Sequence, residues 1–185
     1  MKQRIYWKSL SVSLLLIGFL AEGCEESASR PLPLLGPYEV NDTIIDGMLN
    51  TDTTFTAVRP FSFTDQDGNE VTEVTTNGKV YITDFFFTSC PTICPKMKQQ
   101  MLRLYNDFED NDDVIFLSHS IDPKRDSVAR LHDYAEKLGI SSERWHLMTG
   151  ERDDIYSMAK HYMIAAQEDK LAPGGYAHSG AFLFV

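Results

Sequence analysis

Runs of apolar residues along residues 55–185 alternate between the period of a strand and the period of a helix. Residues 55–74 form two extended segments on either side of DQDGN, and Asp67 followed by Gly68 is typical of a β-hairpin turn. Residues 79–87 (KVYITDFFF) and 114–121 (VIFLSHSI) are continuous apolar and β-branched runs, which predict two buried strands. This part of the chain therefore begins with a hairpin and continues into a buried sheet.

Helical segments are predicted between and after these strands. We expect one helix from Pro95 with Met97, Met101, Leu104 and Phe108 on one face, a second capped by Asp126 and ended by Gly139, and a third from Asp153 or Asp154 to about Tyr162. A short strand is expected at residues 145–148 and a last one at 181–185 (AFLFV). This order of elements is that of an α/β domain.

The first residues resemble a targeting signal rather than part of the fold. Three basic residues precede the apolar stretch LSVSLLLIGFL, which has the length of a signal-peptide core and is shorter than a membrane span. The following AEGC resembles a bacterial lipoprotein box, although Glu22 occupies a position where a small residue is usual. We expect residues 1–23 to be a lipoprotein signal peptide and Cys24 to carry the lipid. An unmodified cysteine near a plain cleavage site is the alternative.

Residues 24–53 are polar and contain Pro31, Pro33 and Pro37 without a sustained apolar period. This composition suits a tether that holds a domain away from a membrane surface. We therefore expect one folded domain over residues 54–185. Because the chain stops inside an apolar run, we also expect the C-terminal part of that domain to be missing from this sequence.

Composition limits the classes of partner. A chain of 185 residues with 43% hydrophobic content is long enough for one globular domain, which we expect to be a monomer. The formal net charge is −10 and no long run of lysine or arginine occurs, so we expect no nucleic-acid partner. A metal cation or a basic protein surface is compatible with this charge.

Two cysteines, Cys90 and Cys94, lie in FFFTSCPTICPKM, at the junction between the strand 79–87 and the helix that begins at Pro95. Unpaired backbone N–H groups and the helix dipole at such a junction favour a thiolate over a thiol. Thiolates are both the nucleophiles of disulfide exchange and soft ligands of Cu(I) or zinc. By itself, the pair does not distinguish a redox dithiol from a metal site.

A metal would need a further ligand, and five histidines are available. His132 and His161 fall within predicted helices, and His119 falls within a buried strand, where a hydrogen-bonded core histidine is the usual state. His178 differs because it lies at a glycine-rich junction, GGYAHSG, before the last predicted strand. If that strand pairs beside the cysteine-bearing strand, His178 faces the cysteine pair.

The segments FTSCPTICP, SIDPKRD, WHLMTG and AHSGAFLFV follow one another between residues 61 and 185. In this order they resemble the Sco/SenC family of copper-binding, thioredoxin-like proteins. The first two segments are the most specific, since a lone C-x-x-x-C would be a weak signal. The resemblance implies a thioredoxin-like fold with a central mixed sheet, flanking helices and an N-terminal β-hairpin.

The resemblance also implies a ligand set and a function. In that family two cysteines and a late histidine bind one copper ion, and here they correspond to Cys90, Cys94 and His178, with Cu(I) and also Cu(II) as the expected cargo. The family is associated with assembly of the CuA centre of cytochrome c oxidase subunit II, by copper delivery, by reduction of that subunit's cysteines, or both. One departure is Ala177, where the family commonly has an acidic residue that could orient the imidazole.

Asp84 precedes Cys90 by six residues, which is the spacing of the buried aspartate that moves protons in thioredoxins. A buried carboxylate beneath the cysteines would have a raised pKa and could act as a general base and proton relay. Pairing of Asp84 with a lysine or a backbone group is the alternative.

Two functions therefore remain open. One is a copper metallochaperone of the bacterial cell envelope, anchored in the membrane through Cys24 and facing the periplasm, which serves a CuA-bearing oxidase subunit or a related copper protein. The other is a membrane-tethered thiol–disulfide oxidoreductase, in which Cys90 and Cys94 form a redox disulfide and His178 is incidental. An oxidising compartment would close the pair into a disulfide unless a metal or a thiol reductant keeps it open, so we expect a thiol reductant among the partners.

Overall fold

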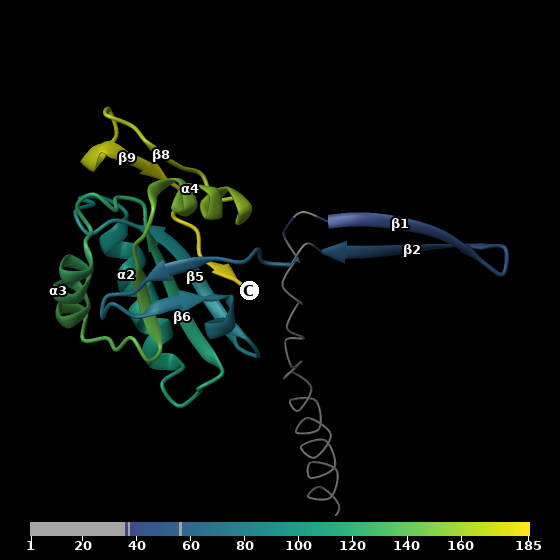
Figure 1. Ribbon diagram of the computed structural model, residues 1–185, viewed down its shortest axis with the longest axis horizontal. Helices are drawn as coiled ribbons and strands as arrows, with labels where there is room; N and C mark the ends of the chain where they lie inside the picture. Colours follow the sequence, from purple (N-terminus) through teal and green to yellow (C-terminus); the bar gives the residue numbers. More distant parts are fainter. Residues whose placement is uncertain (1–35, 37, 56) are drawn as a thin grey trace, which may run out of the picture. The chain divides into compact units, whose positions relative to one another are not determined.

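In the computed structural model, which describes residues 36, 38–55 and 57–185, a four-stranded mixed sheet lies at the centre of the fold (Figure 1). The strand order is β10-β5-β6-β7. Three strands are parallel, namely β5 (Val80–Phe86), β6 (Val114–Ser120) and β7 (Trp145–Met148), whereas β10 (Leu183–Phe184) is antiparallel to β5. The predicted α/β class with a mixed sheet is confirmed.

The described residues also contain helices and smaller ladders. The helices are α2 (Cys94–Asp107), α3 (Val128–Leu138) and α4 (Arg152–His161), with 3-10 turns at Glu73–Thr76 and Pro173–Gly175. The two-stranded ladders are β1 (Tyr38–Ile45) with β2 (Met48–Phe55), β3 (Ser62–Thr64) with β4 (Glu70–Thr72), and β8 (Ala166–Glu168) with β9 (Tyr176–His178). The β3–β4 pair is the hairpin that the DQDGN turn predicted.

The core forms because both faces of the sheet are covered. Phe85 and Phe86 are neighbours in β5 and point to opposite faces, yet both are buried. The helices supply Met101, Leu131 and Met158 to the same apolar cluster. Burial on both faces explains why β5 and β6 are continuous apolar runs rather than alternating ones.

The prediction that Asp126 caps helix α3 is wrong. The N-cap is Ser127, whose side chain accepts a hydrogen bond from the N–H of Arg130. Asp126 is buried and its carboxylate instead accepts hydrogen bonds from Thr88 and Ser120. A carboxylate one residue before the cap is therefore used for a tertiary contact.

The start of helix α4 also differs from the prediction. Glu151 is the N-cap without a side-chain bond, and Asp153 and Asp154 lie in the first turn, where the helix dipole favours carboxylates. The predicted end of α3 is confirmed, because Gly139 is its C-cap with a left-handed φ of 70°.

Residues 38–55 form a hairpin that the sequence pattern did not predict. Its register runs from Tyr38 opposite Phe55 to Ile45 opposite Met48, and all but its last two residues lie within 24–53, the range expected to be a tether. The turn residues Asp46 and Gly47 both have positive φ, as a two-residue hairpin loop requires. All side chains of β1 and β2 are exposed, so the ladder has no apolar core that a burial pattern could reveal.

A second unpredicted hairpin, β8–β9, carries His178. Ala166 lies opposite His178 in its antiparallel register. After this hairpin the chain enters β10, where Leu183 pairs with Thr83 and Phe184 with Ile82. The condition under which His178 would face the cysteines, that the last strand pairs beside the cysteine-bearing strand, is therefore met.

Among the helices of the described part of the chain, none is both long and apolar enough to cross a membrane. The predicted signal peptide, residues 1–23, and the predicted lipidation site Cys24 lie outside the described residues.

Candidate metal centre

The cysteines lie in the loop that follows β5 and in the first turn of α2. The N–H of Cys90 donates to the carbonyl of Phe87 at 3.2 Å, which closes a tight turn directly after the strand. Cys94 is the first residue of α2, and Pro95 follows it where a missing N–H costs no helix hydrogen bond. Both cysteines are buried free thiols, and they lie at the strand-to-helix junction that the sequence predicted.

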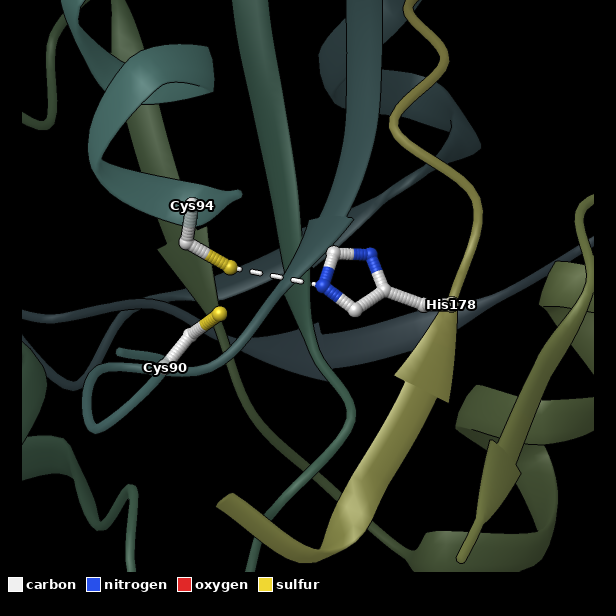
Figure 2. A group of neighbouring side chains, drawn as sticks. All are labelled: Cys90, Cys94 and His178. Carbon is white, nitrogen blue, oxygen red and sulfur yellow. Dashed lines mark hydrogen bonds between the residues drawn. The ribbon is translucent and has the colours of Figure 1, made fainter. Parts of the chain in front are cut away.

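His178 ends β9, and its imidazole faces the two cysteines (Figure 2). Its Nε2 lies 3.4 Å from the Sγ of Cys94. The ligand atoms of Cys90, Cys94 and His178 all lie within 4.8 Å of one another. Within the described residues, this is the only group of three or more histidine, cysteine or acidic side chains gathered closely enough to hold an ion. The structure thus brings together the three predicted ligands.

The hydrogen bond of the His178 ring fixes which nitrogen can accept a metal. Nδ1 lies 3.0 Å from the backbone carbonyl of Ser179, which can only accept, so Nδ1 carries the proton. Burial lowers the pKa of His178, which favours the neutral ring. The lone pair of Nε2 therefore points at Cys94. The Ser179 carbonyl supplies the orienting contact that Ala177 cannot provide.

The two thiols differ in acidity. Burial raises the pKa of the Cys90 thiol, but hydrogen bonds from Thr92 and Cys94 outweigh it and hold this pKa below its usual value. Burial raises the pKa of Cys94 to about 12. The cysteine at the helix start is therefore the one that keeps its proton, and the thiolate expected from the helix dipole belongs to Cys90 on the preceding loop.

Asp84 lies in β5 and pairs with Lys98, one turn of α2 after Cys94. The Lys98 Nζ is 3.3 Å from the Oδ2 of Asp84 and 3.1 Å from the Oγ of Ser118, and Ser118 also donates to Asp84. A lysine partner was the alternative that the sequence left open. Among the described residues the hydrogen bonds of Asp84 go to Lys98 and Ser118 and to neither cysteine, so its role as a proton relay stays a prediction.

The other four histidines are not part of this group of ligands. His119 is fully buried, but neither of its ring nitrogens has a hydrogen-bond partner among the described residues, so the expectation of a hydrogen-bonded core histidine is wrong. His146 bonds Asp65 at 3.0 Å, and His132 bonds Asp67 at 2.8 Å. These contacts attach the β3–β4 turn to β7 and α3.

Comparison with known proteins identifies the family. Residues 50–185 match the SCO1/SenC family. The chain belongs to the SCO1/SenC family. The SCO1 protein homolog of Bacillus subtilis is 38% identical over 130 residues, covering 69% of this chain and 67% of the relative. The mitochondrial protein SCO1 homolog 1 of Arabidopsis thaliana is 34% identical over 107 residues, which cover 57% of this chain and 31% of that relative. This SCO1/SenC chain therefore matches from 31% to 67% of the length of these two relatives.

Solved SCO1/SenC structures have the same fold. A SCO1/SenC family lipoprotein from Bacillus anthracis superposes with a TM-score of 0.63 at 31% identity, covering 69% of this chain and 77% of that one. Arabidopsis thaliana ScoI with copper bound superposes with a TM-score of 0.59 at 30% identity, covering 69% and 80%. A further member, BsSco, has a disulfide switch. It superposes with a TM-score of 0.51 at 35% identity, covering 56% of this chain and 62% of that one. The thioredoxin-like fold class is confirmed.

Three contacts around the centre were missed by sequence reasoning. These are Lys98 beneath the helix start, the Ser179 carbonyl, and Phe87, whose ring lies edge-on to His178 at 5.9 Å. Lys98 carried a readable signal, because a residue four positions after Cys94 shares its helix face. The other two contacts depend on the unpredicted β8–β9 hairpin.

Proposed function

We propose that this SCO1/SenC protein is an extracytoplasmic copper chaperone that holds its cargo through Cys90, Cys94 and His178. The observation that carries the proposal is the convergence of two thiols and one imidazole within 4.8 Å. Three ligands around one ion, with bonds of about 2.0–2.3 Å, lie about 3.5–4.0 Å apart. The three side chains therefore need only a small adjustment to reach a common ion, and the copper-bound Arabidopsis relative supports copper as that ion.

The chemistry of the donors supports Cu(I) as the bound state, with Cu(II) as a second state. Soft thiolates and an imidazole prefer Cu(I) over hard cations. Because the pKa of Cys94 is raised to about 12, its thiol must release a proton when a metal binds, whereas Cys90 enters as a thiolate more readily. Two thiolates, one neutral imidazole and Cu(I) leave one net negative charge, and the buried ammonium of Lys98 lies one helical turn away.

We propose that the acceptor is the CuA centre of cytochrome c oxidase subunit II or of a related copper protein. Membership of the SCO1/SenC family supports this destination, as does the description of BsSco as one of the cytochrome c oxidase assembly proteins. Residues 91–93, between the two cysteines, are exposed. Incoming thiolates of a partner can therefore approach the ligand loop from solvent and replace its ligands one at a time.

The same proposal includes a place in the cell. Residues 1–23 would be removed as a signal peptide, Cys24 would carry a lipid, and a linking segment to residue 53 would hold the domain 54–185 on the periplasmic side of a bacterial membrane. The basic start and apolar core of the first residues support this arrangement. The similar Bacillus anthracis protein, itself a lipoprotein, supports it as well.

Copper titration of the reduced protein tests the proposal. We expect one Cu(I) per chain in competition with a chelator, and His178→Ala should weaken the affinity by at least about 100-fold because it removes a ligand. His132→Ala is the control, since His132 bonds Asp67 away from the centre. A wild type that retains no copper, or a His178→Ala variant with unchanged affinity, would contradict the proposal.

A second function, reduction of a partner's disulfide, is favoured by the unequal thiols. A lowered pKa at Cys90 suits the attacking thiolate, and the buried neighbour Cys94 suits the thiol that resolves the mixed disulfide. Under this function His178→Ala should leave the rate of reduction of Ellman's reagent unchanged while Cys90→Ser abolishes it. A wild type that reduces the reagent no faster than Cys90→Ser would exclude it.

A further inference from the structure

The segment Ser120–Asp126 (SIDPKRD), which leads from β6 to α3, has no part in the ligand set but contacts both halves of it. We propose that this segment, called the bracket here, fixes the position of His178 relative to the cysteines, with the Tyr176 hydroxyl as the decisive contact on the histidine side. The inference rests on the proposed copper function and assigns positioning roles to residues that touch no metal.

The bracket holds the cysteine loop through Asp126. This carboxylate accepts from the backbone N–H of Thr88 at 3.0 Å and from its hydroxyl at 2.6 Å. Ser120, at the other end of the bracket, donates to the same carboxylate at 2.6 Å. Asp126 is completely buried, so these bonds are shielded from water and fix the backbone two residues before Cys90.

The bracket holds the histidine hairpin through Asp122 and Arg125. The hydroxyl of Tyr176 donates to the Oδ1 of Asp122 at 2.8 Å. Arg125 pairs with the other oxygen of Asp122 and donates to the carbonyl of Gly174 at 3.0 Å. Tyr176 is two residues before His178 in β9, so both side chains leave the same face of this strand.

The cysteine loop and the β8–β9 hairpin also pack directly on each other, so the distance between the cysteines and His178 is sensitive to small movements of either. The ring of Phe87 lies 5.2 Å from the ring of Tyr176. A Cβ on Gly174 would lie 2.7 Å from the Phe87 ring, so the loop backbone already lies as close as it can. Directly after His178, the backbone N–H of Ser179 donates to the carbonyl of Ala165, which extends the β8–β9 ladder by one hydrogen bond.

These contacts have one physical consequence for copper. A hairpin of three-residue strands has little stability of its own, so the imidazole must be ordered by what the hairpin touches. The bond from Tyr176 to a carboxylate is charge-assisted and therefore among the stronger ones available. Losing it leaves His178 present but more mobile, and part of the binding energy is then spent on ordering it.

A double-mutant cycle on Cu(I) affinity tests the bracket. The proteins are the wild type, Tyr176→Phe, His178→Ala and the double variant, each reduced and titrated with Cu(I) against a competing chelator. Tyr176→Phe should weaken binding about tenfold, as is typical of residues that orient a ligand. In the His178→Ala background the same change should alter affinity by less than about twofold, because the contact acts through His178.

Tyr162→Phe is the matched control. It removes a buried tyrosine hydroxyl with the same 2.8 Å hydrogen-bond length, here to Tyr81 and away from the centre. It should lower the melting temperature without changing Cu(I) affinity. An unchanged affinity of Tyr176→Phe, or an equal loss in both backgrounds, would overturn the bracket. If His178→Ala bound Cu(I) with the same affinity as the wild type, the proposed copper site itself would be overturned.

Discussion

Lys98 and Asp84 form an ion pair in the interior, with Nζ 3.3 Å from Oδ2 and side-chain exposures of 3% and 0%. The ammonium also lies 3.8 Å from the centre of the Phe86 ring. Ser118 links the pair to the indole N–H of Trp145, which donates to the serine oxygen at 2.9 Å. A buried polar cluster of Asp84, Lys98 and Ser118 therefore lies next to the first turn of α2 within an otherwise apolar core.

Breaking this pair on one side should destabilise the fold more than removing both charges. Asp84→Asn leaves Lys98 buried without its counter-charge, and we expect a loss of about 3–5 kcal/mol in the free energy of unfolding. The double variant Asp84→Asn with Lys98→Met should recover at least half of that loss. Urea denaturation near neutral pH measures both. A loss below about 1 kcal/mol for Asp84→Asn would mean that the pair is not held as described.

Alkylation should distinguish the two cysteines. Because the pKa of Cys90 is lowered and that of Cys94 is raised to about 12, a limiting amount of iodoacetamide should modify Cys90 first. Peptide mass spectrometry gives the fraction modified at each position. In urea the two cysteines should react at similar rates, which provides the control. Faster modification of Cys94 in the folded protein would reverse the assignment of the attacking thiol.

Replacing Gly174 should disturb the centre without touching a ligand. Gly174→Ala adds a Cβ that would lie 2.7 Å from the ring of Phe87, at a backbone φ of 80°. We expect a loss of about 1–2 kcal/mol from the left-handed backbone and about tenfold weaker Cu(I) binding from the displaced hairpin.

Gly139→Ala is the control for this prediction. It has a φ of 70° but nothing within 4 Å of the added Cβ. Both variants should lose about 1–2 kcal/mol from the left-handed backbone, and Gly174→Ala should lose more because of its contact with Phe87, as measured by thermal unfolding, while Gly139→Ala keeps the wild-type Cu(I) affinity. Equal affinities in both variants would show that the contact between Gly174 and Phe87 does not set the position of His178.

His119 should make the fold sensitive to acid. Burial lowers its pKa from 6.5 to about 3, so between these values the unfolded chain binds a proton that the folded chain does not. The free energy of unfolding should therefore fall as the pH falls through this range, by up to about 1.4 kcal/mol per pH unit from this residue. His119→Leu should show a shallower decline in urea denaturation at successive pH values. A slope equal to that of the wild type would contradict the prediction.

His132 provides a contrast of opposite sign. Its hydrogen bond to Asp67 raises its pKa, so its contribution is present below pH 6.5 and is lost as the pH rises through the folded value. His132→Leu should therefore lower stability in acid and leave it unchanged well above neutral pH. Comparing the pH dependence of stability in the two variants therefore distinguishes the effect of a buried neutral histidine from that of an exposed charged one.

The sequence predicted the parts of the fold whose burial is continuous. Strands β5 and β6 were recognisable because residues 79–87 and 114–121 are apolar on both faces, and α2 because Pro95 opens an amphipathic pattern. The cysteine pair could be placed at a strand-to-helix junction for the same reason. Recognition of His178 as the third candidate ligand depended mainly on the family resemblance.

What could not be predicted depends on contacts between distant residues. Hairpin β1–β2 buries no side chain, so apolar residues such as Val40 and Ile44 are exposed in it and no apolar core identifies it as a ladder. Asp126 suggested a helix cap and Asp122 gave no signal, because their partners Thr88 and Tyr176 are 38 and 54 residues away. The hydrogen-bond partner of a buried carboxylate is decided by tertiary packing, which overrides local propensity.

The pairing of β10 with β5 has a consequence for the order of folding. Cys94 and His178 are 84 residues apart, and the hairpin that carries the histidine reaches the thiols through the last ladder of the sheet. A partly folded chain in which β9 and β10 are detached would present two thiols without an imidazole. The three-ligand centre therefore exists only in molecules in which β10 has already paired with β5 and the domain is fully folded.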